Sequence, residues 1–152
     1  MSRILKLYLL LSILFVNIST VNAQTIPDST MQKINGFRAF FETLGKLYPI
    51  DSTITETATE TAGVKGYWFH QEQLIQKTIV IYLHGGGYTS GNINVYRAML
   101  SHLAKSLSLP ILYVEYSLSP ENPYPTANNE ILKVYQEIKK KYPSHKIAII
   151  GK

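Results

Sequence analysis

A run of apolar and β-branched residues, Thr78 to Leu83, leads directly into His84 and three consecutive glycines, Gly85 to Gly87. Such a run is typical of a buried β-strand. Glycine carries no Cβ, so atoms of another molecule can approach the main chain of the following loop closely. Main-chain N–H groups directed at one point stabilise the negative oxygen that develops during acyl transfer. The sequence therefore predicts a buried strand that ends in a loop able to bind an oxyanion.

The residues after this loop alternate between helical and strand patterns. Apolar spacing predicts helices at 94–107 and 126–142, and strands at 111–116 and 146–150. This alternation is typical of parallel strands joined by right-handed helical crossovers. We expect Asn94 to cap the first of these helices. Its inner face is expected to carry Val95, Met99, Leu100, Leu103 and Leu107.

The residues before 78 have a different character. Apolar residues recur at helical spacing from Met31 to Leu47, and Tyr48-Pro49 is expected to end that helix. The threonine-rich stretch 51–61 and the run 64–70 predict two more polar strands, joined by a turn at Gly63. Because these strands are close in sequence, we expect them to pair antiparallel at the edge of the sheet.

The first 23 residues have the organisation of a secretory signal. Arg3 and Lys6 are basic, Leu7 to Val16 is an apolar core, and Val21-Asn22-Ala23 supplies small residues for cleavage. The apolar core is shorter than the roughly 20 residues that a membrane-spanning helix needs. We expect a protein exported to the periplasm or the extracellular space, without a stable membrane span. An uncleaved N-terminal anchor is the alternative.

The amino-acid composition excludes several kinds of catalytic site and binding partner. The chain has no cysteine, which excludes disulfides, thiolate catalysis and cysteine-ligated metals. Its four histidines show no metal-ligand spacing, so we expect no metal and no cofactor. The formal charge of +5 includes lysines near 139–146, where cations favour a helix C-terminus. We therefore expect a solvated helix end there, and no nucleic-acid partner.

A second motif supports a family resemblance. The string from Tyr116 to Ala127 keeps a frame of three prolines together with Leu118 and Glu121. Together with the string His84 to Tyr88, it resembles the signature of hormone-sensitive-lipase-like esterases of the α/β-hydrolase superfamily. This sequence has Ser117 where the family usually has arginine, and Asn122 where it usually has histidine. The resemblance covers roughly residues 30 to 152.

The resemblance implies an α/β-hydrolase fold, a mostly parallel sheet flanked by helices, here ending after the fifth strand. Residues 24–50 would form an N-terminal, cap-like helical segment, and residues 51–152 a partial hydrolase domain. In the family, a serine nucleophile follows that strand in a Gly-x-Ser-x-Gly turn, and the acid and the histidine come later. Gly151 and Lys152 would begin this turn, so the nucleophile is expected just after Lys152 and no catalytic residue lies within the chain.

Within the glycine string, Gly86 and Gly87 are the expected oxyanion donors, and Gly85 is expected to serve mainly in the turn. By the resemblance, His84 is the wrong histidine for the catalytic base, and we expect it to orient the loop by hydrogen bonding. Tyr88 is expected to pack beside the site. Glu121 precedes the expected nucleophile, so a hydrogen-bonding role is favoured over that of the triad acid.

Two serines near the motifs, Ser90 and Ser117, are candidate substitute nucleophiles, but neither lies in Gly-x-Ser-x-Gly, so neither is favoured. Two functional hypotheses stay open. The chain is the N-terminal part of a secreted carboxylic-ester hydrolase that acts on a small-molecule ester, or it is a non-catalytic pseudoenzyme or binding module of the same fold. In both cases we expect the 152 residues alone to be inactive. The sequence does not specify the acyl group, the alcohol group or the oligomeric state.

Overall fold

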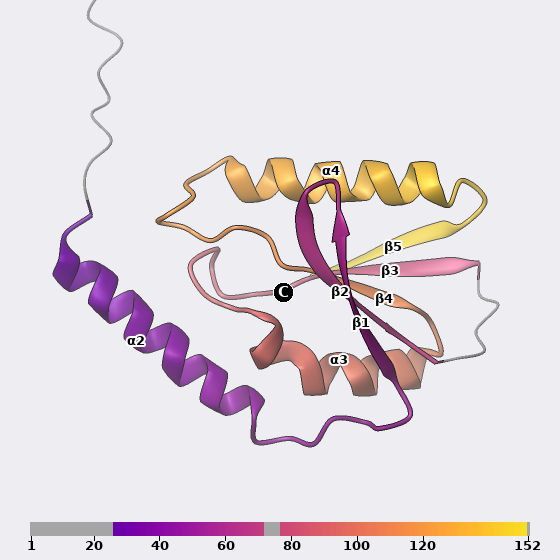
Figure 1. The fold of residues 1–152 in the computed structure, drawn as a ribbon, viewed down its shortest axis with the longest axis horizontal. Coiled ribbons are helices and arrows are strands. Elements are labelled where there is room, and N and C mark those ends of the chain that lie inside the picture. The colour runs from indigo at the N-terminus through magenta and orange to yellow at the C-terminus, as the bar shows by residue number, and fades with distance from the viewer. Residues whose placement is uncertain (1–25, 72–76, 152) are drawn as a thin grey trace, which may run out of the picture.

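The computed structural model describes residues 26–71 and 77–151. The expected signal segment at 1–23, most of the polar connection at 71–77 and Lys152 lie outside the described residues. Within these described ranges, three helices and five strands follow one another (Figure 1). In chain order they are α2 (Asp28–Gly45), β1 (Thr55–Thr61), β2 (Val64–His70), β3 (Thr78–Leu83), α3 (Ile93–Leu107), β4 (Ile111–Val114), α4 (Thr126–Lys141) and β5 (Lys146–Gly151).

The strands form one mixed sheet in the order β1-β2-β4-β3-β5. Strand β3 pairs in parallel with β4 and with β5, whereas β2 pairs antiparallel with β1 and β4. This arrangement confirms the predicted α/β fold, including the parallel strands after residue 78 and the antiparallel pair at one edge. Strand β5 forms the opposite edge, and its Ile149 is 55% exposed.

Helices α3 and α4 cover opposite faces of the sheet (Figure 1). Val80 and Tyr82 of β3 belong to the apolar cluster that includes Leu100 of α3. Their neighbours Ile79 and Ile81 point to the other face, into the cluster that includes α4. Successive strand residues face opposite sides, so a strand covered on both faces must be apolar throughout. This explains the uninterrupted apolar run of β3.

The start of α3 and its inner face differ from the prediction. Asn92, and not Asn94, is the N-cap, and its side chain accepts a hydrogen bond from the Val95 N–H at 3.3 Å. Met99 and Leu107 are each 40% exposed. The buried residues of α3 are Ile93, Ala98, Leu100, Ser101 and Ala104. The prediction was wrong because it followed large apolar side chains, whereas small residues occupy most of the buried face.

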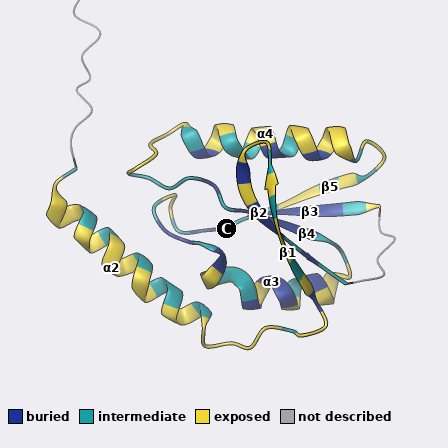
Figure 2. Ribbon diagram, viewed as in Figure 1, coloured by how far each residue is buried: buried dark blue, intermediate teal, exposed yellow. Residues whose placement is uncertain are grey.

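Helix α2 lies beside the loops that follow β3 and β4 (Figure 1), and Figure 2 shows most of it exposed. None of its residues is buried, and Phe37 and Phe40 are 51% and 58% exposed. Its C-terminal end rests on α3, where a Cβ on Gly45 would lie 2.2 Å from the Asn94 carbonyl oxygen. The helix ends at Gly45, earlier than the predicted end at Tyr48-Pro49. No helix in the described part of the chain is long and apolar enough to cross a membrane.

Candidate functional site

Three chain segments meet at the carboxyl edge of the parallel strands. Leu83, the last residue of β3, is in register with Val114 of β4 and with Gly151 of β5. The segment from His84 to Gly91, here called the glycine loop, therefore leaves the sheet beside the end of β5. A cavity of about 340 Å³ opens there, and its walls include Gly87, Tyr116 and Gly151. Ligands of open α/β sheets bind at this edge.

The glycine loop has backbone angles that restrict its sequence. Gly86 has φ of 119° and Gly87 has φ of 60°. A Cβ on Gly86 would lie 2.1 Å from the Ser90 carbonyl oxygen, whereas a Cβ on Gly87 would meet no atom within 4 Å. Gly86 thus requires glycine for both its conformation and its close packing. At Gly87 the conformation alone favours glycine, and Tyr88 adopts the same φ of 60° with a side chain.

The carbonyl of Gly86 fixes the orientation of the peptide group that it shares with Gly87. Four donors reach its oxygen at 3.1 Å, namely the N–H and the hydroxyl groups of both Thr89 and Ser90. In a trans peptide the N–H points away from the C=O, so the Gly87 N–H is directed away from this turn. Gly87 also lines the cavity. The turn therefore presents the Gly87 N–H as a fixed donor.

The three glycines differ in the availability of their N–H groups. The Gly85 N–H donates to the Tyr96 hydroxyl. Burial raises the pKa of Tyr96, and this hydrogen bond partly offsets the rise. Among residues 26–71 and 77–151, the N–H groups of Gly86 and Gly87 have no hydrogen-bond acceptor. The sequence predicted Gly86 and Gly87 as oxyanion donors and Gly85 as part of the turn. The cavity is lined by Gly85 and Gly87, and the donor role of Gly86 and Gly87 stays a prediction.

His84 is enclosed beneath the loop. Its side chain is 3% exposed and stacks on the Tyr116 ring with centroids 4.0 Å apart. Its Nδ1 lies 2.9 Å from the Gly85 carbonyl oxygen, so Nδ1 must carry the proton because a carbonyl only accepts. Nε2 is buried without a partner among the described residues, and burial lowers the pKa of the imidazole. The ring is almost fully buried and its Nδ1 is committed to the glycine loop, so burial, and not the neutral state, favours a supporting role over that of a general base.

Acidification is expected to weaken the fold partly through His84. The pKa of this imidazole is below its ordinary value of 6.5. As pH falls below about 6.5, this imidazole is protonated in the unfolded chain while it stays neutral in the folded chain. The free energy of unfolding therefore decreases until the pH reaches the folded-state pKa. Urea unfolding between about pH 7.5 and 5.5 should show a smaller loss for His84→Asn, which keeps an N–H donor near the position of Nδ1. The same loss in the wild type and His84→Asn would contradict this role, and His102→Asn serves as the exposed control.

Two tyrosines complete the wall near His84. The Tyr116 hydroxyl donates to the His84 carbonyl oxygen at 2.5 Å, and burial raises the pKa of Tyr116. Tyr88 has φ of 60° and is 48% exposed at the rim, with its ring 5.8 Å from that of Tyr116. Tyr88 thus lies beside the cavity, where the sequence placed it, and Tyr116 couples the loop after β4 to the glycine loop.

Glu121 forms an ion pair with Arg38 of α2. This is not the hydrogen bond to a histidine base that a triad acid would make. Two oxygens of its carboxylate accept from the guanidinium at 2.6 and 2.9 Å. This contact lowers the pKa of Glu121 to about 2. The carboxylate joins α2 to the proline-rich loop, which is a structural contact of the kind expected from the sequence.

The two serines weighed as substitute nucleophiles are engaged elsewhere. Ser90 is fully buried, and its hydroxyl donates to the Gly86 carbonyl oxygen. The Ser117 hydroxyl and N–H both donate to the carboxylate of Glu130, each at 2.7 Å. Ser117 occupies the position where the resembled family usually has arginine. Among the described residues neither hydroxyl hydrogen-bonds a histidine, so neither has the geometry of an activated nucleophile.

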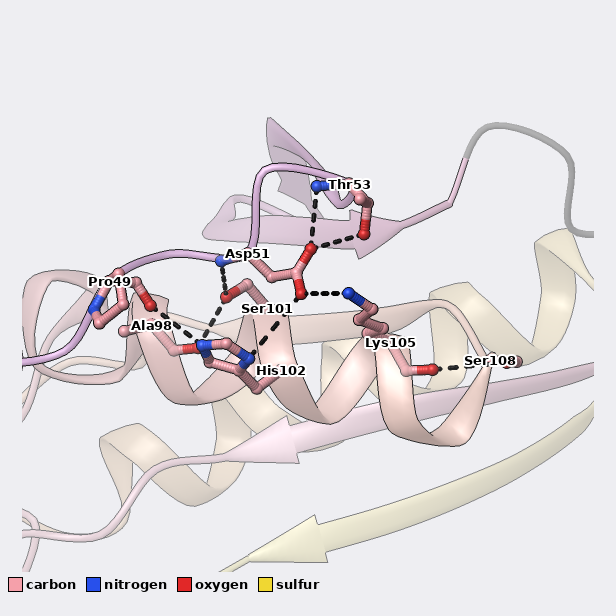
Figure 3. Close-up of polar contacts among 8 residues, drawn as sticks. All are labelled: Pro49, Asp51, Thr53, Ala98, Ser101, His102, Lys105 and Ser108. Carbon is pink, nitrogen blue, oxygen red and sulfur yellow. Dashed lines mark hydrogen bonds and ion pairs between the residues drawn. The ribbon is translucent and has the colours of Figure 1, made fainter.

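A second polar cluster contains serine, histidine and aspartate but lacks the geometry of a triad (Figure 3). The Ser101 hydroxyl is buried and donates to the Ala98 carbonyl oxygen at 2.7 Å. His102 Nδ1 is 3.9 Å from the Asp51 carboxylate, which instead accepts from Lys105 at 2.7 Å. The hydrogen bond from Lys105, followed by those from Thr53, lowers the pKa of Asp51. The cluster attaches the connection between α2 and β1 to α3.

Two residues that shape the site gave little signal in the sequence. Gly91 has φ of 106°, and a Cβ there would lie 2.4 Å from His84 Nδ1, so Gly91 packs directly on the imidazole. The only indication in the sequence was a glycine between a strand and a helix, and this segment was predicted simply as a loop. Arg38 reaches the Thr89 carbonyl oxygen at 2.7 Å from 51 residues away. No local pattern could have indicated this contact.

Comparison with known proteins gives a consistent result. A family described as alpha/beta hydrolase fold matches residues 80–152. An esterase of Acinetobacter venetianus is 32% identical over 104 residues, which are 68% of this chain and 34% of the esterase. Hormone-sensitive lipase of Bos taurus is 36% identical over 59 residues, which are 39% of this chain and 8% of the lipase.

Solved structures show the same likeness. An esterase from the bacterial hormone-sensitive lipase family superposes with a TM-score of 0.72 at 30% identity, covering 85% of this chain and 43% of that structure. A hormone-sensitive lipase from a metagenome library gives a TM-score of 0.72 at 28% identity, covering 90% of this chain and 45% of that structure. The chain thus spans between a third and a half of the length of these two structures and of the Acinetobacter esterase.

Proposed function

Because the chain belongs to the hormone-sensitive-lipase-like α/β hydrolases, we propose that it supplies the oxyanion-binding half of the catalytic centre of a carboxylic-ester hydrolase. One observation carries this proposal. The N–H groups of Gly86 and Gly87, which have no acceptor among the residues that the structure describes, lie in a loop that leaves the sheet beside the end of β5. In this family, the turn after that strand carries the nucleophile.

The proposed chemistry follows from this placement. A serine encoded after Lys152 attacks the ester carbonyl, and a histidine base from later in the whole protein takes its proton. The carbonyl oxygen becomes negative in the transition state and accepts hydrogen bonds from the Gly86 and Gly87 N–H groups. The N–H of the residue after the serine completes this set of donors. Each donor lowers the barrier because it is already oriented before charge develops.

The lining of the cavity favours an uncharged substrate. Besides the loop backbone, its walls include Leu83, Tyr88, Tyr116 and Ile131. Apolar walls with a few oriented polar groups are typical of sites for small organic molecules. We propose a small-molecule ester as substrate. Export through the N-terminal segment is part of the same proposal, and it rests on the charge and hydropathy pattern of residues 1–23.

The test compares two proteins. The complete reading frame that contains this chain should hydrolyse p-nitrophenyl butyrate with saturable kinetics, and residues 24–152 alone should show no turnover above buffer. A serine codon just after codon 152, replaced by alanine, should abolish the activity of the longer protein. Saturable turnover by residues 24–152 would contradict the division of labour proposed here. An inactive complete protein would favour the alternative of a non-catalytic binding module.

A further inference from the structure

Arg38 uses its whole guanidinium to connect three segments. Its Nε donates to the Thr89 carbonyl oxygen at 2.7 Å, and its Nη2 donates to the Ser119 carbonyl oxygen at 2.9 Å. Nη1 and Nη2 also donate to the Glu121 carboxylate, and Nη1 reaches the Asn35 side chain at 3.3 Å. A guanidinium has five N–H donors, and each has an acceptor here. The side chain is 20% exposed, so the group is partly shielded from water.

The Thr89 carbonyl is the first member of a chain of peptide groups. The peptide that Thr89 shares with Ser90 accepts from Arg38 at its oxygen, and its N–H donates to the Gly86 carbonyl oxygen at 3.1 Å. The Gly86 carbonyl belongs to the peptide whose N–H is that of Gly87. Two hydrogen-bonded peptide groups therefore link a positive charge on α2 to a proposed oxyanion donor.

This series of hydrogen-bonded peptide groups affects the Gly87 N–H in two ways. The 89–90 peptide group is hydrogen-bonded at both ends and the 86–87 peptide group is held at its carbonyl, which restrains rotation of the Gly87 N–H away from the cavity. A cation at the carbonyl end also polarises the first peptide group, and hydrogen-bonded groups polarise one another in sequence. Both effects strengthen the Gly87 N–H as a donor to a developing negative charge. None of the residues of α2 is fully buried, so Arg38 is the α2 side chain whose hydrogen bond reaches the glycine loop in the described part of the chain.

We propose that Arg38 is a positioning residue for the ester-hydrolase site, acting on the Gly87 N–H through the 89–90 and 86–87 peptide groups. The inference rests on the proposed function. It also assigns a role to α2, which would hold the oxyanion loop in its working conformation through one side chain. Lysine cannot replace Arg38, because a single ammonium cannot present a planar fork to two carbonyls and a carboxylate together.

The chain offers a matched control in Arg97. This arginine also holds a carboxylate, that of Glu56, through Nε at 2.6 Å and Nη2 at 3.0 Å. Its side chain is 29% exposed, and its remaining contact is with Asn94. Arg97→Ala therefore removes an ion pair of the same kind without touching the glycine loop.

The first test measures amide hydrogen exchange in the ¹⁵N-labelled protein. Arg38→Ala and Arg38→Lys should each speed exchange of the Ser90 N–H by about tenfold or more, because a charge-assisted hydrogen bond is lost from its peptide group. Exchange in the buried strand β3 should stay unchanged, as should Ser90 exchange in Arg97→Ala. Unchanged Ser90 exchange in Arg38→Ala would overturn the proposal. If Arg38→Ala does not fold, Arg38→Lys gives the same comparison.

The second test uses the complete reading frame. Arg38→Ala should lower kcat for p-nitrophenyl butyrate at least tenfold with little change in KM, because the lost interaction strengthens only as the oxyanion forms. Added methylguanidinium should restore part of the loss. Normal kcat in Arg38→Ala, with Arg97→Ala as reference, would overturn the proposal while leaving ester hydrolysis intact. An inactive wild type with the expected Ser90 exchange would instead refute the proposed function and leave the connection from Arg38 standing.

Discussion

Replacing Gly86 with alanine is expected to destabilise the protein by about 2–6 kcal/mol, which is the sum of a conformational cost and a packing cost. A residue with a side chain at φ of 119° is strained, which costs roughly 1–3 kcal/mol. The new Cβ would lie 2.1 Å from the Ser90 carbonyl oxygen and 2.6 Å from its hydroxyl, and overpacking of this kind costs about 1–3 kcal/mol. Neither neighbour can retreat easily, because Ser90 is fully buried and bonded to Gly86 itself.

Gly63→Ala is the control for this change. Gly63 also has a positive φ, 78°, but a Cβ there would meet nothing within 4 Å. Its replacement carries only the conformational cost of the left-handed region, roughly 1–2 kcal/mol. Urea unfolding of both variants measures the difference. Equal losses would show that the glycine loop is not held in the conformation described.

Truncation of Tyr116 is the second large effect. The ring is 5% exposed and stacks on His84 with an angle of 5° between the rings, and its hydroxyl donates to the His84 carbonyl oxygen. Tyr116→Ala should lower the free energy of unfolding by about 3–5 kcal/mol, as for other large buried aromatic residues. Tyr116→Phe keeps the stacking and should lose about 1 kcal/mol, the typical net contribution of one hydrogen bond.

The control for Tyr116 comes from the same connection between β4 and α4. Tyr124 is 83% exposed, and its replacement by alanine should change stability by no more than about 0.5 kcal/mol. Thermal or urea unfolding gives all three values. A Tyr116→Ala loss as small as that of Tyr124→Ala would mean that His84 and the glycine loop do not depend on this ring.

The parts of the fold with strong local patterns could be predicted from the sequence. The run from Thr78 to Leu83 is apolar on both faces because α3 and α4 cover the two sides of β3. The alternation of strands and helices after residue 78 is what predicted β4 and β5 as parallel partners of β3. The glycines were informative because φ values such as 119° at Gly86 strongly favour that residue.

The parts that escaped prediction depend on contacts between distant residues or on small side chains. Arg38 joins residues 51 to 83 positions away, and any solvated helix carries arginines of the same appearance. Asn92 and Asn94 are equally good caps by residue type, and only tertiary structure selects Asn92, whose side chain also donates to Glu42. Helix α2 has a stripe of apolar residues that is not buried by the described residues. The helical spacing therefore predicted the helix but not how little of it is packed.

The central claim is that the glycine loop binds the oxyanion of an ester-hydrolysis transition state. It is tested most directly by comparing p-nitrophenyl butyrate with the matching thionoester, whose carbonyl oxygen is replaced by sulfur, in the complete reading frame that contains this chain. Sulfur accepts hydrogen bonds poorly and is larger, and loss of one oxyanion donor typically costs about 10²–10³ in kcat. After correction for the rates with hydroxide, we expect the ester to be preferred by at least about 10² in kcat/KM. Saturable hydrolysis of both substrates with no preference for oxygen would contradict the claim.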